Sequence, residues 1–223
     1  MTEPLLPKAR TYERSIEHLQ TLYSTAVGVS LAVVMAQVIA VNGRETRISV
    51  AAIPTVVAFL VTLIPFYHGA QRHLDDTYRP DRANHAAPGQ APEAPVPPPI
   101  WVLMGDFLTL FIESCLFFAL AAFVRQPLDF AGSLITLLAL DAAWGATAYF
   151  LGRRRRRRGG EFGWAVLNLL TIVVLAGLFV VGRSSPDPNL WLRWAVLAVC
   201  LGRSAADYFV ARETYFGRMS RAH

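Results

Sequence analysis

Charge is scarce in this chain. Only 17% of its 223 residues are Asp, Glu, Lys or Arg, whereas a soluble domain usually carries about 25%. Apolar residues make up 54% of the chain, and the mean hydropathy is +0.37. This composition excludes a disordered chain and argues against an ordinary soluble enzyme.

Cysteine and catalytic signatures are scarce as well. Cys115 and Cys200 both lie inside apolar runs and show no CxxC spacing, which argues against a disulfide framework and a zinc site. We expect both to be small core residues. The sequence has no GxSxG, P-loop, HExxH or Rossmann fingerprint, and no phosphatidyl-transferase pattern of paired aspartates. It therefore predicts no catalytic residue, no metal ligand and no cofactor.

What the chain does have is long apolar runs. Six of them approach the length of about 20 residues that crosses a bilayer as a helix. They cover 24–41, 48–67, 100–124, 130–152, 162–182 and 190–210. The sequence therefore predicts an all-α integral membrane protein, a bundle of six transmembrane helices that three helical hairpins would build most simply.

Composition also divides the chain into segments. We expect a cytoplasmic or amphipathic N-terminal segment over 1–20, a transmembrane hairpin over 21–78, a Pro-rich cytoplasmic linker over 79–99, a four-helix transmembrane unit over 100–211 and a cytoplasmic tail over 212–223. The N-terminal segment has no apolar core of a cleavable signal peptide. Its apolar residues recur at helical spacing, so it either lies on the membrane surface or extends the first helix.

Arginine placement predicts the orientation of the bundle. Fifteen of the 21 Lys and Arg residues lie in the N-terminal segment, the stretch 68–99, the loop over 152–161 and the tail, and four lie in the opposite loops. The positive-inside rule then places both termini in the cytoplasm of a multi-pass protein of the cell (inner or plasma) membrane. Arg193 and Arg203 fall inside the last span.

Polar and ionisable side chains inside the spans are the strongest functional signal. Each ionisable group costs roughly 2.5–3.5 kcal/mol on insertion scales, so it usually has a partner or lines a wet cavity. The candidate polar core consists of Asp106, Glu113, Asp141, Asn168, Arg203 and Asp207. Four acids face one arginine, so they cannot all be paired. The core is either a proton or cation path or polar pocket, or a static Asp141–Arg203 pair that holds the helices in register.

A faint internal repeat runs through the last four spans. At an offset of 62 residues it aligns Asp106 with Asn168 and Asp141 with Arg203. The third and fourth spans would then be a duplicate of the fifth and sixth.

Two further candidate sites contact lipid headgroups or a partner. At the end of the second span, His68, Arg72, Asp75 and Asp76 share one helical face by i+4 and i+7 spacing. They form either a headgroup site or ordinary surface ion pairs. The second site is the arginine tract, which comprises Arg153, Arg154, Arg155, Arg156, Arg157 and Arg158. It either contacts anionic lipids as a topology signal or recruits a cytoplasmic protein or polyanion.

These features favour one function and leave two alternatives. The leading prediction is a channel or transporter that moves protons or small cations past the intramembrane carboxylates. Because six helices leave little room for a private pore, we expect a homo-oligomer. The first alternative is a non-catalytic membrane subunit that recruits a partner through the arginine tract. The second is an enzyme that modifies lipid headgroups.

Overall fold

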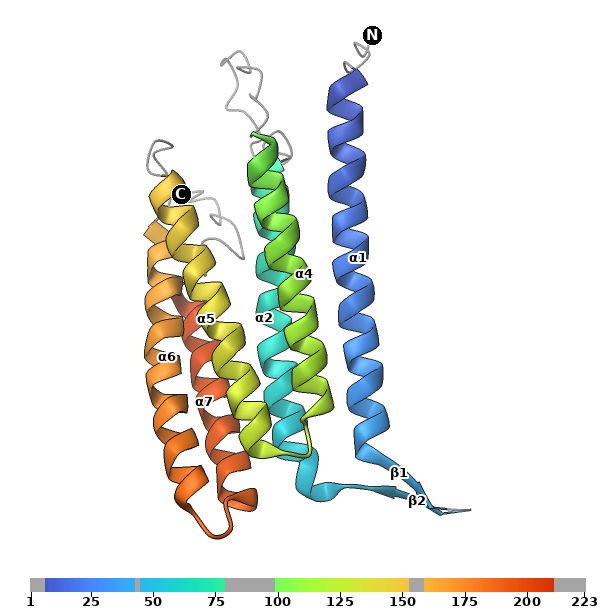
Figure 1. Ribbon diagram of the computed structural model, residues 1–223, viewed down its shortest axis with the longest axis vertical. Coiled ribbons are helices and arrows are strands. Elements are labelled where there is room, and N and C mark those ends of the chain that lie inside the picture. Colours follow the sequence, from blue (N-terminus) through green and yellow to red (C-terminus); the bar gives the residue numbers. More distant parts are fainter. Residues whose placement is uncertain (1–6, 43–44, 79–98, 153–158, 211–223) are drawn as a thin grey trace, which may run out of the picture.

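The computed structural model describes residues 7–42, 45–78, 99–152 and 159–210 as a bundle of long helices with one short β-hairpin (Figure 1). The helices are α1 (Pro7–Val38), α2 (Ile53–Tyr78), α4 (Ile100–Ala122), α5 (Pro127–Gly152), α6 (Gly159–Ser184) and α7 (Asn189–Val210). The hairpin pairs β1 (Ile39–Asn42) with β2 (Glu45–Ile48), and a 3-10 turn, η1 (Val50–Ala52), leads into α2.

The helical architecture agrees with the sequence prediction. Five helices, α1, α2, α4, α5 and α6, are long and apolar enough to cross a membrane. The last helix, α7, has similar length, but Arg193, Arg203 and Asp207 interrupt its apolar residues. A helical membrane bundle is therefore consistent with the structure, although α7 is less apolar than the other five helices over its membrane-length stretch.

Helix α1 is much longer than the first apolar run. It is continuous from Pro7, so the N-terminal segment extends the first helix and does not form a separate surface helix. The reason is visible in its packing, because Ile16, Leu19 and Tyr23 are buried in a small cluster with Leu74 and Leu110. These apolar residues of α1 pack against Leu74 of α2 and Leu110 of α4.

The first connection differs from the expected short loop. Residues 39–41 were expected to end the first span, and residues 48–52 to begin the second. The structure instead has an antiparallel ladder that pairs Ile39 with Ile48 and Asn42 with Glu45. β-Branched residues alternate here on both sides of an Asn-Gly sequence, and this pattern favours a β-hairpin.

The helices alternate in direction along the bundle. One end, which we call the terminal end, holds the start of α1 and the end of α7, and it is at the top of Figure 1. The other, the hairpin end, holds the β-hairpin and the short connections after α4 and α6. Helix α5 packs along α6, α2 packs along α7, and α1 packs mainly along α4.

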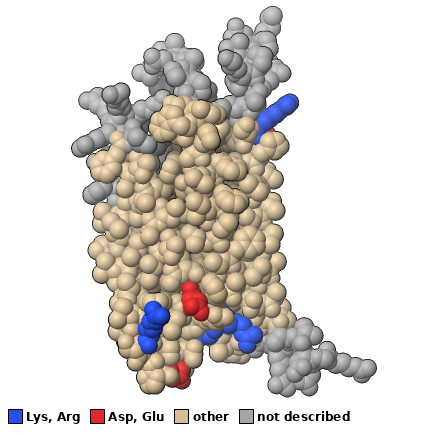
Figure 2. Space-filling model, viewed as in Figure 1, with Lys and Arg blue, Asp and Glu red and all other residues tan. Residues whose placement is uncertain are grey.

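The half of the bundle toward the hairpin end has an apolar core. The ring of Phe117 lies edge-on to the rings of Phe59 and Phe66, with centroid distances of 6.2 and 5.7 Å. Leu134 and Leu138 are buried in the same cluster. On the face drawn in Figure 2, the described charged side chains gather toward the two ends and leave a broad uncharged band between them. Such a band suits contact with lipid.

Arg193 fastens the hairpin end. Its side chain is buried, and one terminal nitrogen donates to the Thr55 hydroxyl at 3.1 Å and to the Val124 carbonyl at 3.2 Å. The other terminal nitrogen donates to the carbonyl of Arg125. A cation that binds carbonyls just beyond a helix C-terminus also opposes the negative end of the helix dipole. Arg193 therefore ties the end of α4 to α2 and α7.

Candidate functional site

The structure brings the predicted polar core together. Its six members are buried side chains of four different helices. Helix α4 supplies Asp106 and Glu113, α5 supplies Asp141, α6 supplies Asn168, and α7 supplies Arg203 and Asp207. Five of them lie in the half of the bundle toward the terminal end, and Glu113 lies near the middle of α4.

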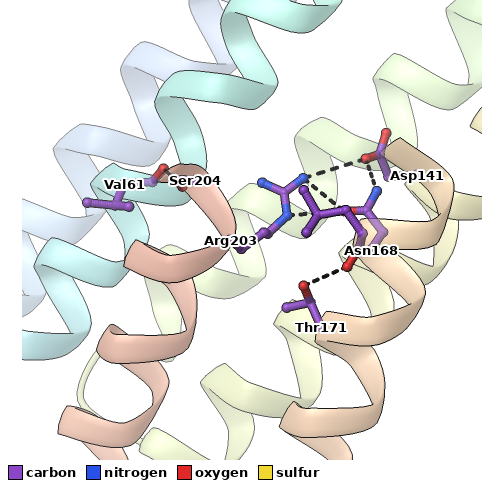
Figure 3. A network of polar contacts seen from close by, with 7 residues as sticks. Val61, Asp141, Asn168, Thr171, Arg203 and Ser204 are labelled. Atoms are coloured by element: carbon purple, nitrogen blue, oxygen red, sulfur yellow. Dashed lines mark hydrogen bonds and ion pairs between the residues drawn. The ribbon is translucent and has the colours of Figure 1, made fainter. Parts of the chain in front are cut away.

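Asn168 is the centre of the first part of this core (Figure 3). Its amide nitrogen donates to Oδ2 of Asp141 at 2.6 Å. Its amide oxygen accepts hydrogen bonds from Nε and a terminal nitrogen of Arg203, at 3.0 and 2.9 Å. The direct contact between Arg203 and Asp141 is longer, at 4.0 Å. The expected pair of Asp141 and Arg203 is thus present, but Asn168 bridges it.

Two contacts with α2 place the Arg203 side chain. The guanidinium carbon lies 4.8 Å from the centroid of the Phe66 ring, which is a cation–π distance. The adjacent residue, Ser204, donates from its hydroxyl to the carbonyl of Val61 at 2.9 Å. The second terminal nitrogen of Arg203 is buried and has no hydrogen-bond partner among the described residues.

Asp106 forms the second part of the core with α2. Its Oδ2 accepts a hydrogen bond of 2.5 Å from the Tyr78 hydroxyl, and its Oδ1 lies 3.2 Å from Nε2 of His73. The Asp106 side chain is 1% exposed, whereas that of His73 is 28% exposed. His73 therefore connects a buried carboxylate to the surface of the bundle.

A small cavity of about 60 Å³ lies between α2, α4, α5 and α6. This is room for a few water molecules. Four titratable side chains line it, namely His73, Asp106, Glu113 and Asp141. Trp144 and Trp164 form part of its wall, and Phe66 lies beside them. The cavity is thus the point at which three of the predicted carboxylic acids meet.

Helix α1 closes the core from the side. The buried ring of Tyr23 stacks on that of Tyr67, with centroids 6.0 Å apart. The Tyr23 hydroxyl faces the Glu113 carboxyl group, and it makes no hydrogen bond of normal geometry with a described residue. Farther toward the terminal end, Gln20 donates to Asp75 at 3.2 Å.

Sequence reasoning missed His73, Tyr78 and Tyr23. His73 stands five residues after His68, so it points about 140° away from the helical face that was predicted to be polar. Tyr23 continues the helical spacing of Ile16 and Leu19 in the sequence, so it was read as an apolar residue and not as a member of the polar core. The available signal was the hydroxyl group of a tyrosine on the buried face of its helix. Such a hydroxyl needs a polar partner, and a buried carboxyl group can provide one.

The described residues of the predicted headgroup site on α2 do not line the cavity. His68 is exposed, and Arg72 and Asp75 are half-buried on α2. The Asp76 side chain and the tract Arg153–Arg158 lie outside the described residues. Cys200 is buried as expected, but Cys115 is exposed on the outer face of α4, so its assignment to the core was wrong.

No protein-family model, curated protein or solved structure matches this chain. Its chemistry must therefore be inferred from the cavity. Among the described residues, no three His, Cys, Asp or Glu side chains are grouped so that they could hold a metal ion. The groups at hand are carboxylic acids, an imidazole and phenols, all of which exchange protons.

Proposed function

We propose that this protein moves protons or small cations across a membrane along a path lined by Asp106, Glu113 and Asp141. The observation that carries the proposal is the cavity that these three acids line together with His73. Carboxylic acids buried in a membrane bundle are costly, and they commonly mark ion pathways or proton relays.

The balance of charges supports this function over a purely structural role. Around the cavity, the described residues include several carboxylic acids and one arginine, Arg203. Arg203 is directed to Asn168, and only one oxygen of Asp141 binds the Asn168 amide. Glu113 and Asp141 both border the cavity, so they can exchange a proton or contact a cation there.

The two halves of the bundle suggest how transport is controlled. The polar half contains the cavity, and the half toward the hairpin end is filled by Phe59, Phe117 and the leucines around them. A path that crosses the whole bundle therefore requires the aromatic packing to open. We propose that the site alternates between access from the terminal end and access from the hairpin end, as a transporter does.

The remaining features follow from this proposal. The protein would reside in the cell membrane as a homo-oligomer with both termini in the cytoplasm, so that the cavity faces the cytoplasmic side. The arginine tract 153–158 would contact anionic lipids at the same side.

The test is ion flux in liposomes that contain the purified protein. Proton flux and monovalent-cation flux are measured for the wild type, Glu113→Gln and Asp141→Asn. The matched controls are Glu17→Gln on the outside of α1 and Asp129→Asn in the first turn of α5, which are exposed in the structure. We expect flux in the wild type and the controls and its loss in the two cavity variants. Equal flux in cavity and control variants would refute the proposal, and no flux in any protein would favour the partner-binding subunit.

A further inference from the structure

We infer that the species bound in the cavity is the proton, carried by water, and that His73 is the residue through which protons enter. This inference rests on the proposed function and narrows it, because it names one of the two species and a residue that passes it on. It is drawn from the size of the cavity, from buried donors that lack partners, and from the position of His73.

The oxygens around the cavity are poorly arranged for a metal cation. Hard cations take about six or more oxygen ligands when the protein binds them. Three of the carboxyl oxygens are already occupied. Oδ1 of Asp106 contacts His73, its Oδ2 contacts Tyr78, and Oδ2 of Asp141 contacts Asn168. A space of about 60 Å³ holds a few waters, but little more. A proton needs only one oxygen at a time and a water beside it.

Unpartnered buried donors point to water in this space. One terminal nitrogen of Arg203 and the Trp164 indole nitrogen have no hydrogen-bond partner among the described residues, and the Tyr23 hydroxyl makes no hydrogen bond of normal geometry with them. The side chains of Tyr23 and Arg203 are 1% and 4% exposed. Nearly all buried polar groups in proteins are hydrogen-bonded, often to an internal water. Tyr23 faces Glu113, Trp164 lines the cavity, and Arg203 stacks on the cavity residue Phe66, so waters that satisfy them would lie beside the acids.

The position of His73 suits an entry residue. His73 is partly exposed, and its ring contacts the buried carboxyl group of Asp106 directly. An imidazole ring has two nitrogens, so one can accept a proton while the other donates one, and histidine commonly serves as a proton shuttle. Its ring lies edge-on to Trp144, with centroids 6.1 Å apart, which holds the imidazole against the cavity wall.

The transfer can be written as balanced steps. A hydronium ion at the surface gives its proton to Nδ1 of His73, so one O–H bond breaks and one N–H bond forms. His73 then releases the proton on Nε2 to Oδ1 of Asp106, which is 3.2 Å away. Asp106 passes a proton along a chain of cavity waters to Glu113, about 10 Å farther along the same face of α4. Each O–H bond that breaks on one oxygen is replaced by an O–H bond on the next. No other reactant is consumed.

Several other groups influence these protonations. Helix α2 adds Arg72, Asp75 and Tyr78, and α1 adds Tyr23. Helix α5 adds Asp141, and α7 adds Arg203 and Asp207. The described side chains that α6 directs to the core, Asn168 and Trp164, are uncharged. The pH dependence of flux is therefore a property of the whole cluster, and only its dependence on His73 tests the entry role.

The experiment uses the full chain in liposomes with a pH-sensitive dye inside. Proton flux is followed with and without sodium or potassium gradients, for the wild type, His73→Ala and His73→Gln. The control is His18→Ala, an exposed residue of α1. We expect proton flux without cation flux in the wild type, a loss of about a hundredfold in both His73 variants, and no loss in the control. Imidazole in the external buffer should restore flux in His73→Ala, which a merely structural role would not allow.

The outcomes separate this inference from the proposed function. Sodium or potassium flux that depends on Glu113 would support transport and overturn the assignment of the proton. Wild-type proton flux in both His73 variants would overturn the entry role alone. If no ion crosses, infrared spectroscopy decides whether the cavity takes up protons. A carboxylic-acid band that titrates with pH and disappears in Glu113→Gln supports proton binding without transport, and its absence overturns both.

Discussion

The amide nitrogen of Asn168 lies 2.6 Å from Oδ2 of Asp141, although 27 residues separate the two in the sequence. The oxygen of the same amide accepts two hydrogen bonds from Arg203. An uncharged side chain thus contacts a carboxyl group on one helix and a guanidinium group on another. Both charged groups are held in place without a tight ion pair between them.

The first prediction concerns this bridge. Replacing Asn168 with leucine keeps the branched shape of the side chain but removes both the oxygen and the nitrogen of the amide. Because Asp141 and Arg203 would lose buried hydrogen bonds, we expect the free energy of unfolding to fall by about 1–3 kcal/mol. Denaturation of the purified protein in detergent measures the change. Gln126→Leu, which removes an exposed amide between α4 and α5, should have little effect. Equal effects of the two variants would mean that the bridge does not contribute to stability.

The second prediction is a double-mutant cycle on Arg203 and Asp141. Arg203→Met leaves Asp141 without its nearby cation, and loss of one member of a buried charge pair typically costs about 3–5 kcal/mol. Adding Asp141→Asn removes the uncompensated charge, so the double variant should be more stable than Arg203→Met alone. The same unfolding assay measures the interaction energy. Strictly additive losses would show that the 4.0 Å contact carries no coupling.

The third prediction separates the two ends of the bundle. Arg193→Gln removes the hydrogen bonds to Thr55 and to the carbonyls of Val124 and Arg125. We expect a loss of about 1–3 kcal/mol in the free energy of unfolding, with flux per folded molecule and its pH dependence unchanged. The control is Arg183→Gln, because Arg183 is exposed and lies over the Phe179 ring. An altered pH profile in Arg193→Gln would show that this end also takes part in proton exchange.

The fourth prediction uses two glycines of α6. A Cβ atom on Gly182 would lie 3.0 Å from a methyl carbon of Leu192 and 3.1 Å from one of Leu128, whereas a Cβ on Gly177 meets no atom within 4 Å. Gly182→Ala should therefore lower stability by about 1–3 kcal/mol, as overpacking usually does. Gly177→Ala should leave it unchanged or raise it by up to about 1 kcal/mol. The difference in melting temperature between the two variants is the measurement, and equal shifts would contradict the close packing at Gly182.

The helices were predictable because hydropathy over 20 residues is a strong signal, whereas their exact ends were not. Residues 39–41 and Ile48 are apolar and were assigned to the first two spans, but the β-branched residues on both sides of Asn-Gly favour a hairpin. Pro127 was expected in a loop, yet it is the first residue of α5, where a proline costs little. The residues that form the turns determined these boundaries. Hydropathy averaged over about 20 residues does not detect the effect of single turn residues.

The membership of the polar core was predictable, but its geometry was not. Glu113 and Asp141 stand out because acids are rare inside apolar runs. The contact of His73 with Asp106 depends on how α2 and α4 are rotated against each other, which a single sequence does not record. The offset of 62 residues aligned Asp141 with Arg203, and the structure places these two side chains 4.0 Å apart. The same repeat aligned Asn168 with Asp106. In the structure Asn168 contacts Asp141 and Arg203.

The composition of α7 has a consequence for the synthesis of the protein. Charged residues keep α7, alone among the described helices, from being apolar enough to cross a membrane. Its two arginines bind the Thr55 hydroxyl on α2, the Asn168 amide on α6 and the carbonyls of Val124 and Arg125. All these partners precede it in the chain, so they are already made when α7 leaves the ribosome. Before α7 is made, Asp141 lacks the guanidinium of Arg203. Once α7 is made, both of its arginines can bind their partners at once. A chain that stops before α7 would therefore present unmatched acids to the quality-control proteases of the cell, and completion of the last helix would be the step that releases it from them.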